Sequence, residues 1–133
     1  MEIEKKPLKI LIIDNHAGLV KQIEARLSLE ADFHVCLVAP LEKLTESLIE
    51  CEPDLLLIDP YFDNSYKYDR IKLARNLRPA MQVVVLTAVV DTAMALRLKK
   101  EGVTCVMEKG ISSSELVDSL RKVIVSECEP KSS

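Results

Sequence analysis

Residues 55–60 read Leu55-Leu56-Leu57-Ile58-Asp59-Pro60, and this short stretch decides the fold. Four consecutive apolar residues are typical of a strand that is covered on both faces, as in a parallel sheet. Pro60 has no backbone N–H for a sheet ladder, so the strand has to end before it. The carboxylate of Asp59 is therefore expected at the end of a buried strand, where it faces a crevice and not the core.

Two further apolar runs, and one short run that includes Glu108, are followed by polar residues in the same way. They are Ile10–Ile13 before Asp14 and Asn15, Val83–Leu86 before Thr87, and Cys105–Glu108 before Lys109. In open parallel sheets, ligands bind beyond the carboxyl ends of the strands. The four strand ends together therefore predict a phosphoryl site at one edge of a sheet.

Helical patterns alternate with these runs. Leu19, Ile23 and Leu27 repeat every four residues, and later segments carry similar stripes. Asp91 is a predicted N-cap, Gly102 a predicted helix end, and Ser112 opens a capping box with Glu115. The expected strands are Lys9–Asp14, His34–Val38, Leu55–Asp59, Gln82–Thr87 and Thr104–Met107. Five βα units linked by right-handed crossovers predict an α/β fold with helices on both faces of the sheet.

The length and composition fit one domain. A chain of 133 residues with 48% hydrophobic residues can bury roughly two-thirds of its unfolded surface. We expect the domain at residues 8–127, with tails at 1–7 and 128–133. Residues 60–69 are predicted to form one long loop beside the site.

The charge pattern excludes several classes of function. The formal net charge is −3 and the basic residues are dispersed, so no direct binding of nucleic acid is expected. No run approaches the roughly 18 apolar residues of a membrane span, and the start lacks the apolar core of a signal peptide. We therefore expect a cytoplasmic protein. Its four cysteines show no C-x-x-C pair and are expected to be reduced, structural thiols.

The loop after the first run suits a cation. Mg²⁺ prefers oxygen ligands and keeps several waters, so the predicted ligands are Asp14, Asp59, the amide oxygen of Asn15 and the backbone carbonyl of Tyr61. His16 is assigned to the loop or to the first helical turn, with a position at the edge of the site as the alternative, and not to the ligand set. With a cation present, Asp59 is a candidate nucleophile toward a phosphoryl donor. Thr87 and Lys109 are placed to stabilise the phosphoryl oxygens.

These motifs resemble the receiver domains of two-component response regulators, with the NarL-type subgroup the most similar. The resemblance covers about residues 8–127 and rests on Ile12–His16, Pro53–Asp59, Val85–Ala88 and Met107–Lys109. It implies a flavodoxin-like (βα)5 fold, a doubly wound parallel five-stranded sheet with strand order 2-1-3-4-5.

The resemblance also implies functions for single residues. It makes Asp59 the phospho-acceptor, Asp14 a metal-site acid, Thr87 with Ala88 the switch and phosphate-contacting positions, and Lys109 the phosphate-contacting lysine. The implied partner is a sensor histidine kinase or a phosphotransfer protein. A homodimer through the segment from Asp91 to Glu127 is a further implication.

The chain departs from the family pattern at three places. Asn15 stands where the family has a second acid, Val106 replaces the switch aromatic, and the usual sequence after the acceptor is replaced by residues 60–65. These departures keep open an alternative, a pseudo-receiver that serves as an interaction module without phosphorylation. An aspartyl phosphatase would need an acid where Tyr61 stands, and a flavin carrier would need a hydroxyl-rich loop. We therefore do not expect an enzyme that turns over a small substrate.

Overall fold

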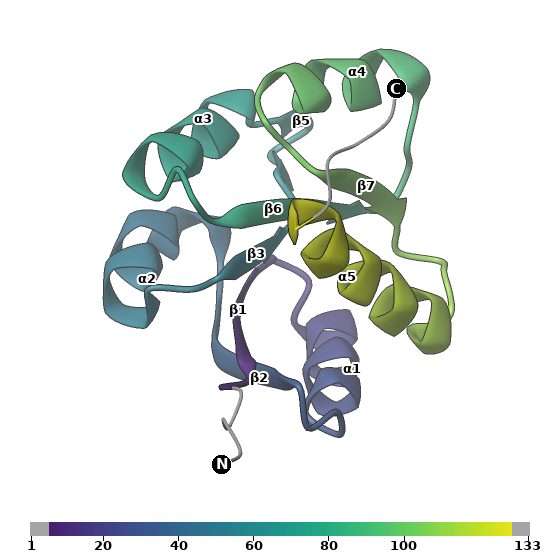
Figure 1. The fold of residues 1–133 in the computed structure, drawn as a ribbon. Helices are drawn as coiled ribbons and strands as arrows, with labels where there is room; N and C mark the ends of the chain where they lie inside the picture. Colours follow the sequence, from purple (N-terminus) through teal and green to yellow (C-terminus); the bar gives the residue numbers. More distant parts are fainter. Residues whose placement is uncertain (1–5, 129–133) are drawn as a thin grey trace.

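The computed structural model describes residues 6–128 as an α/β domain (Figure 1). The first half contains β1 (Leu8–Ile13), α1 (Ala17–Leu27), β2 (Phe33–Ala39), the 3-10 helix η1 (Leu41–Lys43), α2 (Leu44–Cys51) and β3 (Leu55–Ile58). The second half contains β4 (Tyr61–Phe62), β5 (Ser65–Tyr66), α3 (Tyr68–Leu77), β6 (Gln82–Thr87), α4 (Thr92–Lys100), β7 (Cys105–Glu108) and α5 (Ser113–Cys128). Residues 1–5 and 129–133, which are most of the predicted tails at 1–7 and 128–133, lie outside the described residues. Helix α5 continues to Cys128, one residue beyond the expected end of the domain.

Five parallel strands form the main sheet in the order β2-β1-β3-β6-β7. Since β4 and β5 form a separate hairpin, this order is the predicted 2-1-3-4-5, and the predicted fold is confirmed. In the central strand β3, all four residues are buried. Such a continuous apolar strand requires cover on both faces.

The helices supply that cover. Helices α1 and α5 lie on one face of the sheet, and α2, α3 and α4 lie on the other (Figure 1). Two buried clusters fill the two interfaces, one around Ile10, Leu27 and Leu120 and one around Leu11, Leu48 and Leu98. The alternation of side chains along β1 sends Ile10 and Leu11 to opposite clusters.

Local signals fix the helix ends. Asp91 caps α4, because its side chain accepts a hydrogen bond of 2.8 Å from the backbone N–H of Met94. Gly102 follows α4 with a φ of 96°, a left-handed conformation that a side chain would strain. Ser112 accepts a bond of 3.1 Å from the N–H of Glu115 at the start of α5. The predicted caps are thus present.

Two expectations about the chain were wrong. Residues 60–69 do not form one long loop, because Tyr61 pairs with Tyr66 and Phe62 with Ser65. Asp63 and Asn64 both take positive φ values, 52° and 62°, which suit a two-residue hairpin turn. The cysteines are not all reduced, because Cys36 on β2 and Cys51 at the end of α2 form a disulfide, with Cα atoms 6.1 Å apart. The packing of α2 against β2 brings this pair within disulfide range.

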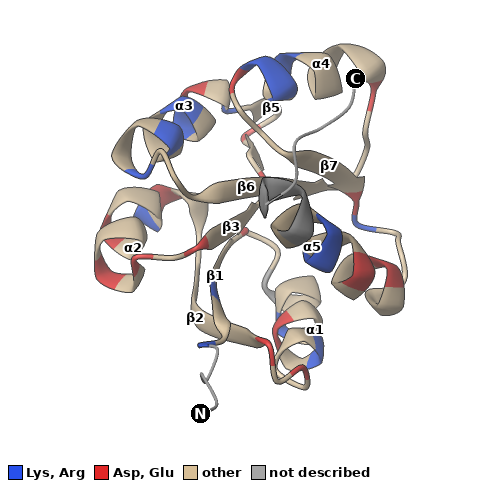
Figure 2. Cartoon of the chain, in the orientation of Figure 1, with Lys and Arg blue, Asp and Glu red and all other residues tan. Residues whose placement is uncertain are grey.

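Figure 2 shows that Lys and Arg occur on α1, α3, α4 and α5, with acidic residues among them. Arg121 on α5 pairs with Glu30 and Asp32 beside the start of β2, so this ionic contact joins α5 to the α1 side of the domain. Hydrogen bonds from Arg26 and then from Arg121 lower the pKa of the Glu30 carboxyl, and those from Arg121 lower the pKa of the Asp32 carboxyl. Within residues 6–128, no helix has the length and apolar character that a membrane crossing requires.

Candidate phosphoryl and metal site

The predicted site residues lie at the carboxyl edge of the main sheet. Backbone hydrogen bonds continue the ladder one residue beyond two of the strands. The N–H of Asp59 donates to the carbonyl of Ile13 over 2.9 Å, and the N–H of Lys109 donates to the carbonyl of Thr87 over 2.8 Å. These bonds align the ends of neighbouring strands. Side chains that are far apart in the sequence are therefore brought together at the carboxyl edge of the sheet.

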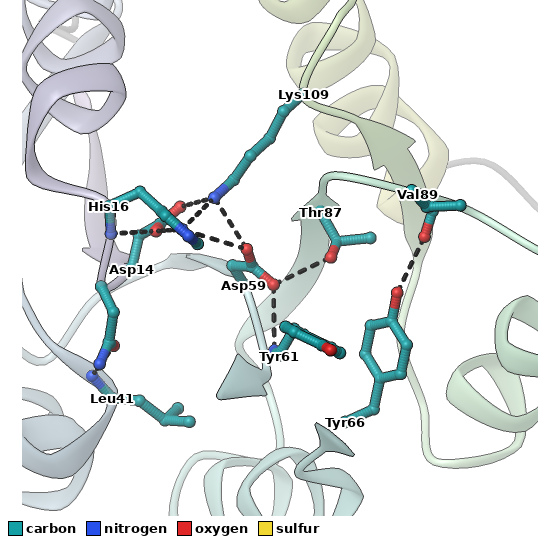
Figure 3. Close-up of polar contacts among 10 residues, drawn as sticks. Asp14, His16, Leu41, Asp59, Tyr61, Tyr66, Thr87, Val89 and Lys109 are labelled. Carbon is teal, nitrogen blue, oxygen red and sulfur yellow. Dashed lines mark hydrogen bonds and ion pairs between the residues drawn. The ribbon is translucent and has the colours of Figure 1, made fainter. Parts of the chain in front are cut away.

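Lys109 joins the two carboxylates. Its Nζ lies 2.8 Å from Oδ2 of Asp14 and 2.8 Å from Oδ2 of Asp59 (Figure 3). Asp14 is 8% exposed and Asp59 is 3% exposed, and two buried like charges are unfavourable without a compensating cation. The ammonium of Lys109 supplies this compensation in the structure.

The second oxygen of Asp59 is held by two donors. The hydroxyl of Thr87, itself buried, donates to Oδ1 of Asp59 over 3.0 Å. The backbone N–H of Tyr61 donates to the same oxygen over 3.0 Å. The Asp59 carboxylate therefore has a fixed orientation, with one oxygen toward Thr87 and the other toward Lys109.

Asn15 does not join this cluster through its amide oxygen. That oxygen accepts a hydrogen bond of 2.9 Å from the N–H of Leu41. Leu41 begins η1, and the first N–H groups of a helix have no partner within the helix. Asn15 satisfies one of these groups, so the predicted ligand oxygen points to the loop after β2.

The cluster also contains His16, for which a position at the edge of the site was the alternative prediction. The Nδ1 atom of His16 lies 2.9 Å from Nζ of Lys109 and 3.1 Å from Oδ1 of Asp14. The backbone N–H of His16 also donates to Oδ1 of Asp14 over 2.8 Å. The sequence could have indicated this contact, because an aspartate side chain can accept a hydrogen bond from the backbone N–H two residues later, and His16 follows Asp14 by two residues.

The remaining predicted residues surround the cluster. Tyr61 lies in β4, and its backbone N–H donates to Asp59. Ala88 is exposed and follows β6 directly after Thr87. Val106 is half-buried in β7 and pairs with Val85. Tyr66 lies nearby, and its hydroxyl donates to the carbonyl of Val89 over 2.9 Å.

The fold and this site together define a class of protein. A doubly wound sheet presents a buried carboxylate, a hydroxyl and a lysine at its carboxyl edge, and residues 10–121 match the family model of the response regulator receiver domain. The chain belongs to this family, whose members are signalling modules of two-component systems. The predicted recognition is confirmed.

One relative gives a more particular comparison. The response regulator protein VraR of Staphylococcus saprophyticus is 27% identical to this chain over 117 residues. The matched part is 87% of this chain but 56% of the relative. The chain therefore spans a little over half the length of that relative.

Solved structures show the same fold. The signal receiver domain of NarL from Mycobacterium tuberculosis superposes with a TM-score of 0.82 at 16% identity, over 92% of this chain and 99% of that one. A CheY-like receiver domain from Methanospirillum hungatei gives a TM-score of 0.82 at 18% identity, over 94% and 100% of the two chains. At these identities the likeness concerns the fold alone.

Proposed function

We propose that Asp59 accepts a phosphoryl group from the phosphohistidine of a sensor histidine kinase or a phosphotransfer protein. One observation carries the proposal: Thr87 and Lys109 hold opposite oxygens of a buried Asp59 carboxylate. A structural strand-end aspartate would not need both a hydroxyl and an ammonium directed at it from two other strands. The family match and the carboxylate cluster favour this receiver function over an interaction module that does not use phosphate.

The transfer itself is a displacement at phosphorus. A carboxylate oxygen of Asp59 forms a bond to phosphorus, while the bond between phosphorus and the donor imidazole nitrogen breaks. The electron pair of that bond stays on the imidazole, which takes a proton from solvent. Asp59 becomes an acyl phosphate and loses no proton, because its carboxylate is the nucleophile.

Lys109 and Thr87 stabilise the transferred group. Phosphoryl transfer depends mainly on positioning and on stabilising charge at the phosphoryl oxygens. The ammonium of Lys109 and the hydroxyl of Thr87 already lie at hydrogen-bond distance from Asp59. Small movements of these side chains would bring them to phosphoryl oxygens. We propose that the backbone N–H groups next to Ala88 also contact the phosphoryl group.

The donor set fits a magnesium ion. Two carboxylates, Asp14 and Asp59, converge within one cluster, and Mg²⁺ in proteins uses one or two carboxylates together with waters. When bound, Mg²⁺ would screen the charge between the carboxylates and the phosphoryl group. The Tyr61 carbonyl remains a proposed ligand, supported by the position of Tyr61 directly beside Asp59. Asn15 would contribute only after releasing Leu41.

The output would be a change of shape. We place the proposed homodimer surface on the segment from Asp91 to Glu127, which contains α4, β7 and α5. Val106 lacks the ring of the usual switch residue, so the motion of Thr87 has to reach α4 by another contact. The proposed setting is the cytoplasm, and we expect no direct contact with nucleic acid, since the basic residues are dispersed (Figure 2).

Intact-mass measurement after incubation with Mg²⁺ and acetyl phosphate tests whether Asp59 accepts a phosphoryl group. We expect one added phosphoryl group in the wild type and none in Asp59→Asn. Asp63→Asn is the matched control, since it makes the same change at the hairpin turn and should be phosphorylated like the wild type. A wild type that stays unmodified, or an Asp59→Asn variant that gains the group, would overturn the proposal.

A further inference from the structure

His16 brings a nitrogen atom into the carboxylate cluster. Its Nδ1 lies 3.1 Å from Oδ1 of Asp14 and 3.8 Å from Oδ2 of Asp59. One ligand atom from each of the three residues can be chosen so that all lie within 4.8 Å of one another (Figure 3). The cluster therefore offers two carboxylates and one imidazole.

The contact with Lys109 shows how the imidazole is oriented. An ammonium group has donors and no acceptor, so the contact of 2.9 Å between Nζ of Lys109 and Nδ1 of His16 is favourable in the tautomer whose Nδ1 presents its lone pair to Nζ. Oδ1 of Asp14 is also an acceptor. Two acceptors 3.1 Å apart repel each other unless a positive charge lies between or beside them. In this structure that charge is the ammonium of Lys109.

The spacing of the donor atoms also suits a metal ion. Zinc-class ions bind imidazole nitrogen and carboxylate oxygen at about 2.0–2.2 Å, which places neighbouring ligand atoms roughly 3–3.6 Å apart. The distances of 3.1 Å and 3.8 Å from Nδ1 to the two carboxylates lie at or close to this range. Only small adjustments would let the three atoms share an ion.

The position of His16 permits such adjustments. Its backbone is fixed by the bond of 2.8 Å from its N–H to Asp14, directly before α1. Its side chain is 60% exposed, so the ring can turn without disturbing the core. The amide oxygen of Asn15, in contrast, accepts a hydrogen bond from the N–H of Leu41. This oxygen, which would favour magnesium, therefore points away from the cluster.

We propose that His16 is the third protein ligand of the cation site, and that the site consequently prefers a divalent transition ion to Mg²⁺. This inference rests on the proposed function, because it concerns the same carboxylates. Imidazole suits first-row transition ions, whereas Mg²⁺ is held by oxygen ligands and water. The bound ion takes the place of the Lys109 ammonium between the carboxylates, which leaves Lys109 available for the phosphoryl group.

Calorimetric titration of the whole chain with Mg²⁺, Mn²⁺ and Co²⁺ tests whether His16 is a ligand of the bound ion. Carboxylates alone already favour the later ions of this series, so the decisive quantity is the change on His16→Gln. We expect this variant to lose about tenfold in Co²⁺ affinity and a smaller factor in Mn²⁺ affinity, while Mg²⁺ affinity stays within about twofold. His34→Gln, an exposed histidine on β2, is the matched control and should change none of the three.

Proton NMR of the Co²⁺-loaded protein gives a second readout. A cobalt-bound imidazole should show a strongly shifted ring N–H signal, present in the wild type and His34→Gln and absent in His16→Gln. If His16→Gln keeps both the signal and the Co²⁺ affinity, the inference is wrong. Failure of the proposed function looks different: Asp59 would remain unphosphorylated while the His16-dependent Co²⁺ binding persisted.

Discussion

The hydroxyl of Tyr66 donates a hydrogen bond of 2.9 Å to the backbone carbonyl of Val89. This bond joins the hairpin that follows Asp59 to the loop that follows Thr87 (Figure 3). The Tyr66 ring also meets the ring of Tyr61 edge-on at 5.0 Å. The two loops beside the site are therefore connected by one side chain.

Tyr66→Phe should loosen the loop between β6 and α4. The variant keeps the ring and loses the hydrogen bond, which is worth about 1 kcal/mol of unfolding free energy. Hydrogen exchange should show faster exchange at residues 88–91. Tyr61→Phe removes a hydroxyl from the same hairpin and serves as the control. Equal exchange in Tyr66→Phe and the wild type would show that the bond does not hold the loop.

Thr87→Val should slow phosphorylation of Asp59. Valine has the shape of threonine but lacks the hydroxyl that contacts Oδ1 of Asp59. Loss of a hydrogen bond to a charged group costs about 1.5–3 kcal/mol, so the rate with acetyl phosphate should fall at least tenfold. Thr104→Val, before β7, removes a hydroxyl at the opposite edge of the sheet and should leave the rate unchanged. A normal rate in Thr87→Val would remove Thr87 from the transfer step.

Lys109→Met should destabilise the domain in buffer that contains a chelator. The two buried carboxylates would lose their shared cation, a change expected to cost about 3 kcal/mol in urea unfolding. Adding Asp14→Asn removes one of the uncompensated charges and should restore at least half of the loss. Lys99→Met, on the exposed side of α4, is the control. A Lys109→Met variant as stable as the wild type would contradict the compensating function of Lys109.

Asn15→Asp should strengthen the binding of Mg²⁺. The new carboxylate can still accept from the N–H of Leu41, and it adds a negative charge next to Asp14. With the dielectric constant of water and a separation of about 8 Å, Coulomb's law gives about 1 kcal/mol between a unit charge and a divalent ion, roughly fivefold in affinity. Asn64→Asp adds the same charge at the hairpin turn and should have a smaller effect. Unchanged calorimetric titrations of Asn15→Asp would place this position outside the electrostatic reach of the site.

Arg121 should stabilise the domain near neutral pH and not in acid. Hydrogen bonds from Arg26 and then from Arg121 lower the pKa of Glu30 from its usual 4.5, and those from Arg121 lower the pKa of Asp32 from its usual 3.8. Groups with a lowered pKa stabilise the folded state above the unfolded-state pKa, and this contribution disappears as the pH falls through the folded-state value. Arg121→Ala should therefore lower the melting temperature at pH 7, with a difference that shrinks below about pH 4. Lys21→Ala controls for net charge, and a constant difference down to pH 2 would contradict the prediction.

The sequence alone determined the sheet and its functional edge. Runs such as Leu55–Ile58 are apolar at every position. A strand with one exposed face would alternate apolar and polar residues, so such a run indicates a strand that is covered on both faces. Polar residues directly after those runs had to lie at the carboxyl edge, so Asp14, Asp59, Thr87 and Lys109 were predictable as neighbours. The helix ends at Asp91 and Ser112 were also readable, because caps depend on residues within one turn.

Only the tertiary structure decided how the side chains around that edge are used. Asn15 turns away because Leu41, 26 residues later, presents an N–H at the start of η1, and no local pattern reveals this need. The exposed His16 directs its Nδ1 atom to the cluster because Lys109, 93 residues away, offers a cation beside Asp14. Tyr66 finds Val89 only after the chain has folded its hairpin against the next loop. Local patterns determine where a strand ends, whereas the partner of a polar side chain depends on groups that only the folded chain brings into reach.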